Sequence, residues 1–190
     1  MQPTCSLPRY AESPVAVNPL DLERLYDAHG DFIRALLARL LGPDGDPDDL
    51  TQDVFLLALQ KLPADEIACP RLWLCRVAVK LAASARRRLK LRKALRRGFP
   101  FAFSDRRTPE VLAEAREETA RVNRALDGLS EKKREVFVLF EMLGMNGHEV
   151  AASLDIPLAT AHTRLHYARR EFVAQYEREL QTPDDGGRHA

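Results

Sequence analysis

Apolar residues recur at the helical period in three successive segments of the first half of the chain. The first segment spans roughly 20–41 and ends at a stretch rich in glycine and proline, 42–47. The second spans about 48–62 and carries three aspartates near its positive dipole end. The third begins near Pro70, which suits the first turn of a helix, and continues to about residue 95. The pattern therefore predicts three consecutive helices.

The stretch 98–109 has no such periodicity and contains two prolines, which indicates a linker. Its aromatic residues either dock on a neighbouring helix or anchor a partner protein; they are Phe99, Phe101 and Phe103. Beyond the linker, the pattern predicts one helix that ends at Gly128 and another that ends at Gly144. Ser130 is a plausible N-cap for the second of these helices.

The segment from Asn146 onward has the features of a helix-turn-helix. Asn146 stands three residues before Glu149, which is the spacing of a capping box at a helix start. Asp155 lies where the chain must turn, and aspartate tolerates the left-handed conformation better than most residues. Pro157 then suits the start of a second helix, whose outer face would offer the polar and basic side chains that a DNA major groove accepts. Those residues are Thr160, His162, Thr163, Arg164, His166, Arg169 and Arg170.

These patterns predict an all-α protein of two small helical domains joined by a linker, with the helix-turn-helix in the C-terminal domain. A composition of 45% hydrophobic and 7% aromatic residues suits such a fold. The expected boundaries are a disordered lead-in at 1–19, a first domain at 20–97, the linker at 98–109, a second domain at 110–178 and a flexible tail at 179–190.

A formal net charge of +1 conceals one strongly basic block. Residues 1–70 hold 5 Lys/Arg against 12 Asp/Glu, a net of −7, whereas 71–107 hold 13 against 1, a net of +12. Within the block, residues 86–97 include eight cations and have no acidic residue four positions away, so this helix repels itself unless a polyanion neutralises it. Trp73, one turn before Arg76, either lies in the core or stacks on an exposed base.

Several other kinds of site are not expected. His148-Glu149 begins like a zinc-protease motif, but Ala152 stands where the second histidine is required. The sequence offers no phosphate loop and no nucleophile elbow, so it predicts neither an enzyme nor a cofactor nor a metal. Three scattered cysteines suit reduced thiols. The lack of a membrane-spanning segment or a signal-peptide pattern predicts a cytoplasmic location without membrane insertion.

Four segments in order resemble the extracytoplasmic-function class of bacterial RNA polymerase sigma factors. DLTQDVF at 49–55 is similar to the family's D-L-V-Q-E-T-F, and LWLCRVA at 72–78 is similar to A-W-L-Y-R-I-A. ALDGL at 125–129, with REVF at 134–137, matches the pattern A-L-x-x-L-P-x-x-x-R-E-V-F. IPLATAHTRL at 156–165 parallels I-P-x-G-T-V-x-S-R-L. The resemblance covers about residues 20–178 and implies sigma domains two and four.

The resemblance also implies partners and roles. Core RNA polymerase would be bound through the clamp helices of its largest subunit by Asp49, Gln52, Asp53, Phe55 and Leu56. The melted minus-ten element of promoter DNA would be bound by Arg71, Trp73, Arg76, Lys80, Ser84, Arg87 and Arg88. The minus-thirty-five element would be bound by Thr160, His162, Thr163, Arg164, His166 and Arg169. An anti-sigma factor is a further implied partner.

Two alternatives to a promoter-opening sigma factor follow from the sequence. Lys80 and Ser84 stand where the family often has Asn and Asp, which suits a sigma-like protein that titrates polymerase or an anti-sigma factor without opening DNA. The helix-turn-helix alone would equally suit a regulator that binds promoters without polymerase.

Overall fold

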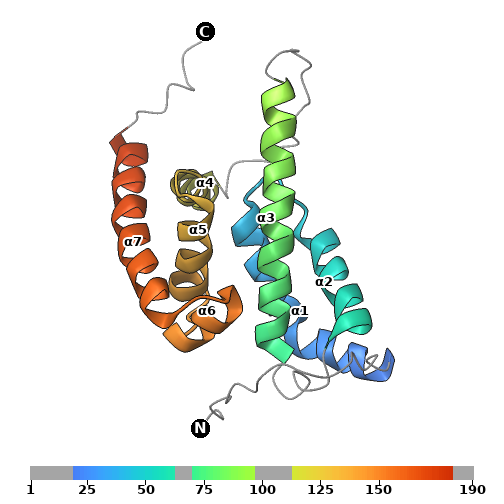
Figure 1. The fold of residues 1–190 in the computed structure, drawn as a ribbon. Coiled ribbons are helices and arrows are strands. Elements are labelled where there is room, and N and C mark those ends of the chain that lie inside the picture. Colours follow the sequence, from blue (N-terminus) through green and yellow to red (C-terminus); the bar gives the residue numbers. More distant parts are fainter. Residues whose placement is uncertain (1–18, 63–69, 97–112, 182–190) are drawn as a thin grey trace.

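A computed structural model of the chain describes residues 19–62, 70–96 and 113–181, and every regular element in these ranges is helical (Figure 1). Three helices form the N-terminal bundle: α1 (Pro19–Leu41), α2 (Pro47–Lys61) and α3 (Pro70–Arg96). The C-terminal bundle consists of α4 (Ala113–Asp127), α5 (Glu131–Phe137), the π-helical segment η3 (Val138–Met142), α6 (Gly147–Leu154) and α7 (Leu158–Gln181). The three expected N-terminal helices and the helix-turn-helix are confirmed.

The N-terminal bundle is built around α1, which packs against both α2 and α3. Leu36 and Leu37 of α1 are fully buried, as is Leu74 of α3. Each such leucine contributes about 2 kcal/mol relative to an exposed one. Asp46 caps α2 by accepting hydrogen bonds from the backbone N–H groups of Asp48 and Asp49. This cap fixes the start of α2 and hence the direction in which its outer face points.

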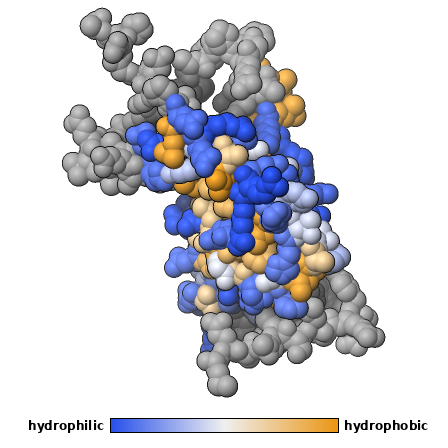
Figure 2. All heavy atoms as spheres, turned by 90° about the vertical axis from the view of Figure 1, so that its left-hand side faces the viewer, coloured by the Kyte–Doolittle hydropathy of each residue, from blue (hydrophilic) through white to orange (hydrophobic). Residues whose placement is uncertain are grey.

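In the C-terminal bundle, α7 packs against α4, α5 and α6. Ala161, Leu165 and Ala168 form its buried face, and the Phe172 ring stacks on Phe137 with centroids 4.5 Å apart. The opposite face of α7 is exposed. Figure 2 views the molecule from this side, where hydrophilic residues alternate with smaller apolar patches. α7 is therefore an amphipathic helix with a free polar side.

The helix predicted to end at Gly144 departs from a regular α-helix in its last part. η3 follows α5 directly, and the Leu143 N–H bonds to the Val138 carbonyl at 3.1 Å, the five-residue step of a π-helix. Gly144 ends the segment with φ +64, a conformation that favours glycine. The periodicity predicted this end but not the π turn. Ser130 stands at the N-cap of α5 as expected, yet its side chain makes no capping hydrogen bond.

The two bundles pack against each other. α3 contacts α6, α1 contacts η3, and one core of buried apolar residues includes members of both bundles. In Figure 1, α3 crosses in front of α1, with α2 on one side and the C-terminal helices on the other. The expected linker with its phenylalanines, the lead-in and most of the tail lie outside the described residues. Among the helices described, none is long and apolar enough to cross a membrane.

Candidate nucleic-acid interface

The helix-turn-helix has the local geometry that its sequence predicts. The Glu149 N–H donates to Asn146 Oδ1 at 3.1 Å, and the Asn146 N–H donates to Glu149 Oε2 at 2.9 Å, which completes the capping box. Asp155 adopts the left-handed conformation, with φ 53 and ψ 52. The Ile156 N–H then bonds to the Ala151 carbonyl at 3.0 Å and closes the turn. These contacts set α7 at a fixed angle to α6.

Most of the predicted groove-reading residues of α7 are exposed. His162, Thr163, His166, Arg169 and Arg170 lie on its solvent side. Thr160 and Arg164 are half-buried, so they contribute to the edge of this surface and not to its centre. Tyr167, which the sequence analysis did not single out, is 50% exposed, and its ring meets His166 edge-on at 5.5 Å. Tyr167 could have been identified from the sequence, because residues four positions apart share one face of a helix and Tyr167 follows Thr163 by four.

His162 lies against two other elements. Its ring centroid is 5.7 Å from that of Phe140 on η3. At the start of α6, a Cβ added to Gly147 would lie 2.9 Å from His162 Nε2 and 2.9 Å from a methyl group of Leu158. Glycine at this position therefore lets the His162 ring lie close to the backbone of α6. The ring is held from both sides, which limits its freedom before any contact with DNA.

Two further side chains on α7 have partners within the chain. Arg169 donates to Glu141 Oε1 of η3 from Nε at 3.0 Å and from Nη2 at 2.6 Å. The Thr163 hydroxyl donates to the Ala159 carbonyl at 2.8 Å, so its remaining lone pairs can accept but its proton is already used. The π-helical segment thus supplies contacts to both His162 and Arg169.

The predicted minus-ten residues of α3 do not all face open solvent. Arg76, Lys80 and Arg87 line a groove of about 610 Å³ whose opposite wall includes Glu131 and Glu135 of α5. Of the other residues in that set, Ser84 is half-buried and Arg88 is exposed. Arg71 is half-buried, with its guanidinium 4.1 Å above the Phe32 ring centroid. The basic face of α3, defined here as Arg76, Lys80 and Arg87, therefore borders the C-terminal bundle, with Arg76 half-buried and with Lys80 and Arg87 exposed.

Trp73 belongs to the core of the N-terminal bundle. Its side chain is 8% exposed and forms part of the buried apolar cluster. Of the two alternatives for Trp73, the structure shows the core position, so the ring is not exposed for stacking on a base in this arrangement. A tryptophan among Leu74, Ala78 and the α1 leucines buries more apolar area than a surface position would allow.

The predicted polymerase-binding residues of α2 form a stripe on the outside of the helix. Asp49, Gln52 and Asp53 are exposed, and Leu56 is exposed to 53%. Phe55 departs from the expectation, because it is 4% exposed and packs edge-on against Tyr26 with ring centroids 4.9 Å apart. Phe55 thus packs in the core beneath the exposed residues of α2 and forms no surface contact in this arrangement.

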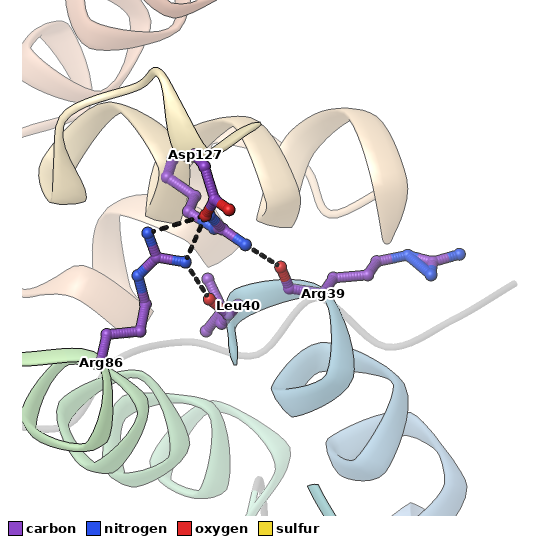
Figure 3. Close-up of polar contacts among 5 residues, drawn as sticks. Arg39, Leu40, Arg86 and Asp127 are labelled. Carbon is purple, nitrogen blue, oxygen red and sulfur yellow. Dashed lines mark hydrogen bonds and ion pairs between the residues drawn. The ribbon is translucent and has the colours of Figure 1, made fainter. Parts of the chain in front are cut away.

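An ion-pair network joins the two bundles near the middle of α3 (Figure 3). Asp127 of α4 accepts hydrogen bonds from Arg86 Nη1 and Nη2, each at 3.2 Å, and from Arg134 Nη1 of α5 at 2.5 Å. Arg86 also donates to the Leu40 carbonyl at 2.9 Å, and Arg134 donates to the Arg39 carbonyl at 2.9 Å. The basic helix has no acidic partner at the i+4 spacing, but carboxylates of the C-terminal bundle pair with two of its cations, Asp127 with Arg86 and Glu131 with Arg87.

Burial changes the ionisation of several groups at this junction. Burial, followed by the nearby Glu131 carboxylate, raises the pKa of Glu135 to about 7, against the opposing effect of Arg164 and other cations. Burial raises the pKa of the Cys75 thiol to about 12, while Arg71 and the Ser153 hydroxyl of α6 oppose the shift. Cys75 is a buried free thiol, as the sequence analysis expected of a reduced cysteine. No acidic, histidine or cysteine side chains gather into a metal-binding group within the described ranges.

Two known sequence families match this chain. Residues 25–92 match the family Sigma-70 region 2, and residues 119–172 match Sigma-70, region 4. The ferric citrate uptake sigma factor FecI of Escherichia coli (strain K12) is 30% identical over 142 residues, which cover 74% of this chain and 82% of that relative. The chain belongs to the extracytoplasmic-function family of RNA polymerase sigma factors.

Other relatives extend the comparison. ECF RNA polymerase sigma factor SigE of Mycolicibacterium smegmatis is 28% identical over 83% of this chain, which spans 63% of the length of SigE. The structure of CnrH in complex with the cytosolic domain of CnrY is 28% identical, with a TM-score of 0.64 over 85% of this chain and 90% of that one. The sigma factor RpoE with the anti-sigma factor NepR from Bartonella quintana shares the fold, with a TM-score of 0.60, 20% identity and coverage of 86% of this chain and 98% of that one.

Proposed function

We propose that this sigma factor binds core RNA polymerase in the cytoplasm and directs it to promoter DNA, while the polymerase carries out RNA synthesis. The observation that carries the proposal is the separation of two surfaces within one chain. An exposed acidic stripe runs along α2, and an exposed polar face runs along α7 at the other side of the molecule (Figure 1). We assign residues 20–97 to sigma domain two, 98–109 to the linker and 110–178 to sigma domain four.

The α2 stripe is the proposed contact with the clamp helices of the polymerase largest subunit. It consists of Asp49, Gln52, Asp53 and Leu56, which recur every three or four residues and therefore share one helix face. An exposed leucine beside carboxylates suits a contact in which charge steers the approach and apolar burial adds affinity.

The basic face of α3, with Arg71, Ser84 and Arg88, is the proposed site for the minus-ten element. Arginine and lysine side chains neutralise phosphates and release counterions, which makes such binding dependent on salt. Lys80, Arg87 and Arg88 are exposed, whereas Arg76 is half-buried in the groove between the bundles.

The exposed face of α7 is the proposed reader of the minus-thirty-five element. His162, Thr163 and His166 supply short polar groups, and Arg169 adds a cation, with Thr160 and Arg164 at the edge. Because the Thr163 proton is engaged by the Ala159 carbonyl, Thr163 would accept a hydrogen bond from a base amino group or contact a thymine methyl. We include Tyr167 in this surface because it is exposed beside His166.

An anti-sigma factor is a further proposed partner. CnrH, 28% identical to this chain, is in complex with the cytosolic domain of CnrY. Such a partner would compete with polymerase or promoter DNA for the surfaces described above.

Binding to core polymerase can be tested through Leu56 with a matched control. Leu56 is 53% exposed on the α2 stripe and Leu180 is 54% exposed near the end of α7, so each can be replaced by alanine at little cost in folding. L56A should weaken binding to core polymerase by about tenfold, because a truncated interface leucine costs about 1.4 kcal/mol. L180A should leave the affinity unchanged. Equal affinities for both variants and the unmodified protein would refute the α2 assignment.

A further inference from the structure

The groove between α3 and the C-terminal bundle is large enough for a small ligand. Its volume is about 610 Å³, and small-molecule sites in proteins usually span about 300–1,000 Å³. Residues of α3 form one wall, and residues of α5 and α6 form the other. Lys80 and Arg87 on the first wall and Lys132 on the second are exposed, so the groove opens to solvent. A small molecule can therefore enter it without movement of either bundle.

The groove carries an excess of positive charge. Its lining includes two carboxylates, Glu131 and Glu135, and four cations, which are Arg76, Lys80, Arg87 and Lys132. Four cations against two ionised carboxylates leave a net charge of +2. Burial, followed by the nearby Glu131 carboxylate, raises the pKa of Glu135 to about 7, so the excess is larger still near neutral pH. Neither Lys80 nor Lys132 forms an ion pair within the described ranges, so both can bind an added anion.

Ser153 of α6 adds a buried hydroxyl to the same lining. The residue is only 1% exposed, and its Oγ has no hydrogen-bond partner among the residues that the structure describes. The Cys75 thiol lies nearby, but a thiol is a weak hydrogen-bonding group. Native proteins satisfy the large majority of their buried polar side-chain atoms. The Ser153 hydroxyl is therefore available to donate a hydrogen bond to a ligand in the groove.

The remaining side chains of the lining include an apolar set. Val79 and Ala83 of α3 and Leu154 of α6 line the groove together with the charged residues. Arginine and lysine bind phosphate oxygens through charge-assisted hydrogen bonds, whereas apolar walls favour a flat ring. An inorganic phosphate ion would use only the first of these features. A molecule that combines phosphate groups with a ring uses both.

From these observations we propose that the groove binds a small phosphorylated molecule with an aromatic ring, of which a nucleoside diphosphate is the simplest example. Lys80 and Lys132 would pair with its phosphates, and Ser153 would donate a hydrogen bond to it. The proposal goes beyond promoter recognition, because it assigns a ligand other than DNA. Since Lys80 and Arg87 also belong to the proposed minus-ten surface, the bound ligand would compete with DNA for these cations.

Titration calorimetry on the full chain at low salt tests the ligand class with three probes: ADP, inorganic pyrophosphate and adenosine. ADP should bind at one site per chain. Pyrophosphate, which lacks the ring, should bind severalfold more weakly, and adenosine, which lacks the phosphates, at least about tenfold more weakly. Absence of ADP binding would overturn the proposal. Equal affinities for ADP and pyrophosphate would also overturn it, because a ring would then contribute nothing.

A charge-matched pair of variants tests the location of the site. K132Q and K133Q each remove one positive charge from α5, but Lys132 lines the groove whereas Lys133 pairs with Glu171 of α7. Neither lysine belongs to a proposed DNA-binding surface. K132Q should weaken ADP binding severalfold, and K133Q should leave it unchanged. Equal losses in the two variants would mean that net charge controls binding and would overturn the assignment to the groove.

Ser153 provides a second test that separates ligand binding from folding. Since its hydroxyl has no partner among the described residues, S153A should keep the melting temperature of the unmodified protein in the absence of ADP. It should nevertheless weaken ADP binding severalfold. Unchanged ADP affinity in S153A would overturn the role of this hydroxyl. None of these assays contains polymerase or DNA, so they decide the proposal whether or not the chain directs transcription.

Discussion

The Asp127 carboxylate of the C-terminal bundle accepts two hydrogen bonds from Arg86 of the N-terminal bundle, each at 3.2 Å. The same oxygen accepts a third from Arg134 at 2.5 Å. The Arg86 and Arg134 side chains are 9% and 1% exposed, whereas Asp127 is 48% exposed. One partly exposed carboxylate thus balances the charge of two buried guanidinium groups. Burial, followed by the nearby Arg86 cation, lowers the pKa of Arg134, and Asp127 opposes this shift.

Replacing Asp127 should therefore destabilise the protein strongly. D127N keeps the size of the side chain but leaves two buried guanidinium groups without a counter-charge, which should cost about 3 kcal/mol in the free energy of unfolding. Urea denaturation provides the measurement. E179Q is the control, since Glu179 pairs with Arg124 near the surface and its loss should cost less than about 1 kcal/mol. Similar costs for both variants would contradict the central role of Asp127.

Glu135 should make stability depend on pH near neutrality. Its pKa is raised from 4.5 to about 7, so the folded protein binds more protons than the unfolded chain between these values. Stability due to this group is present at low pH and decreases as the pH rises through that window. The melting temperature should fall between about pH 5 and about pH 8, and E135Q should reduce that fall by about 3 °C. E177Q, which also removes one negative charge, is the control and should keep the full fall in melting temperature. If the melting temperature of E135Q fell with pH as much as that of the unmodified protein, the assignment of this pH dependence to Glu135 would be contradicted.

Asp155 supports a prediction about backbone strain in the turn of the helix-turn-helix. With φ 53, the residue occupies a conformation that costs an L-amino acid about 1 kcal/mol unless the side chain is short and polar. D155A should lower the free energy of unfolding by about that amount, whereas D155G should leave it nearly unchanged. Both variants lose the carboxylate, but only D155A keeps a Cβ in the left-handed conformation. A comparison of their thermal unfolding therefore separates backbone strain from loss of the carboxylate. Equal destabilisation by both would show that the carboxylate itself matters.

The local structure around Asp155 could be predicted because it depends on neighbours in sequence. The Asn146–Glu149 capping box and the left-handed turn at Asp155 follow from residue types within a few positions of each other. The ends of the first three helices likewise follow from Pro and Gly signals.

Contacts between distant segments could not be predicted in the same way. Arg86 meets Asp127 across 41 residues, and Arg134 meets the Arg39 carbonyl across 95. The basic run was interpreted as a surface for a polyanion because local spacing shows no acidic partner, but tertiary packing supplies one. Phe55 and Trp73 were assigned to surfaces by family similarity, and their burial depends on how α1 covers α2 and α3.

Gly147 should affect DNA binding through His162. In G147A the new methyl group would lie 2.9 Å from His162 Nε2, so the ring must move away from α6. We expect the duplex affinity to fall about as much as in H162A, and the double variant G147A/H162A to fall no further, because both changes act through one side chain. Fluorescence anisotropy with a duplex probe measures each affinity, and near-native melting temperatures serve as the control for folding. Additive losses would show that Gly147 acts independently of His162.

Transcription from genomic template tests the central claim most directly. Core RNA polymerase is supplied with this protein and with fragmented DNA of the source genome, and the run-off products are mapped. We predict discrete start sites that are absent with core polymerase alone, and that are weakened by H162A and by L56A. Stable binding to core polymerase without any template-specific product would contradict the account and would favour a sigma-like protein that titrates polymerase.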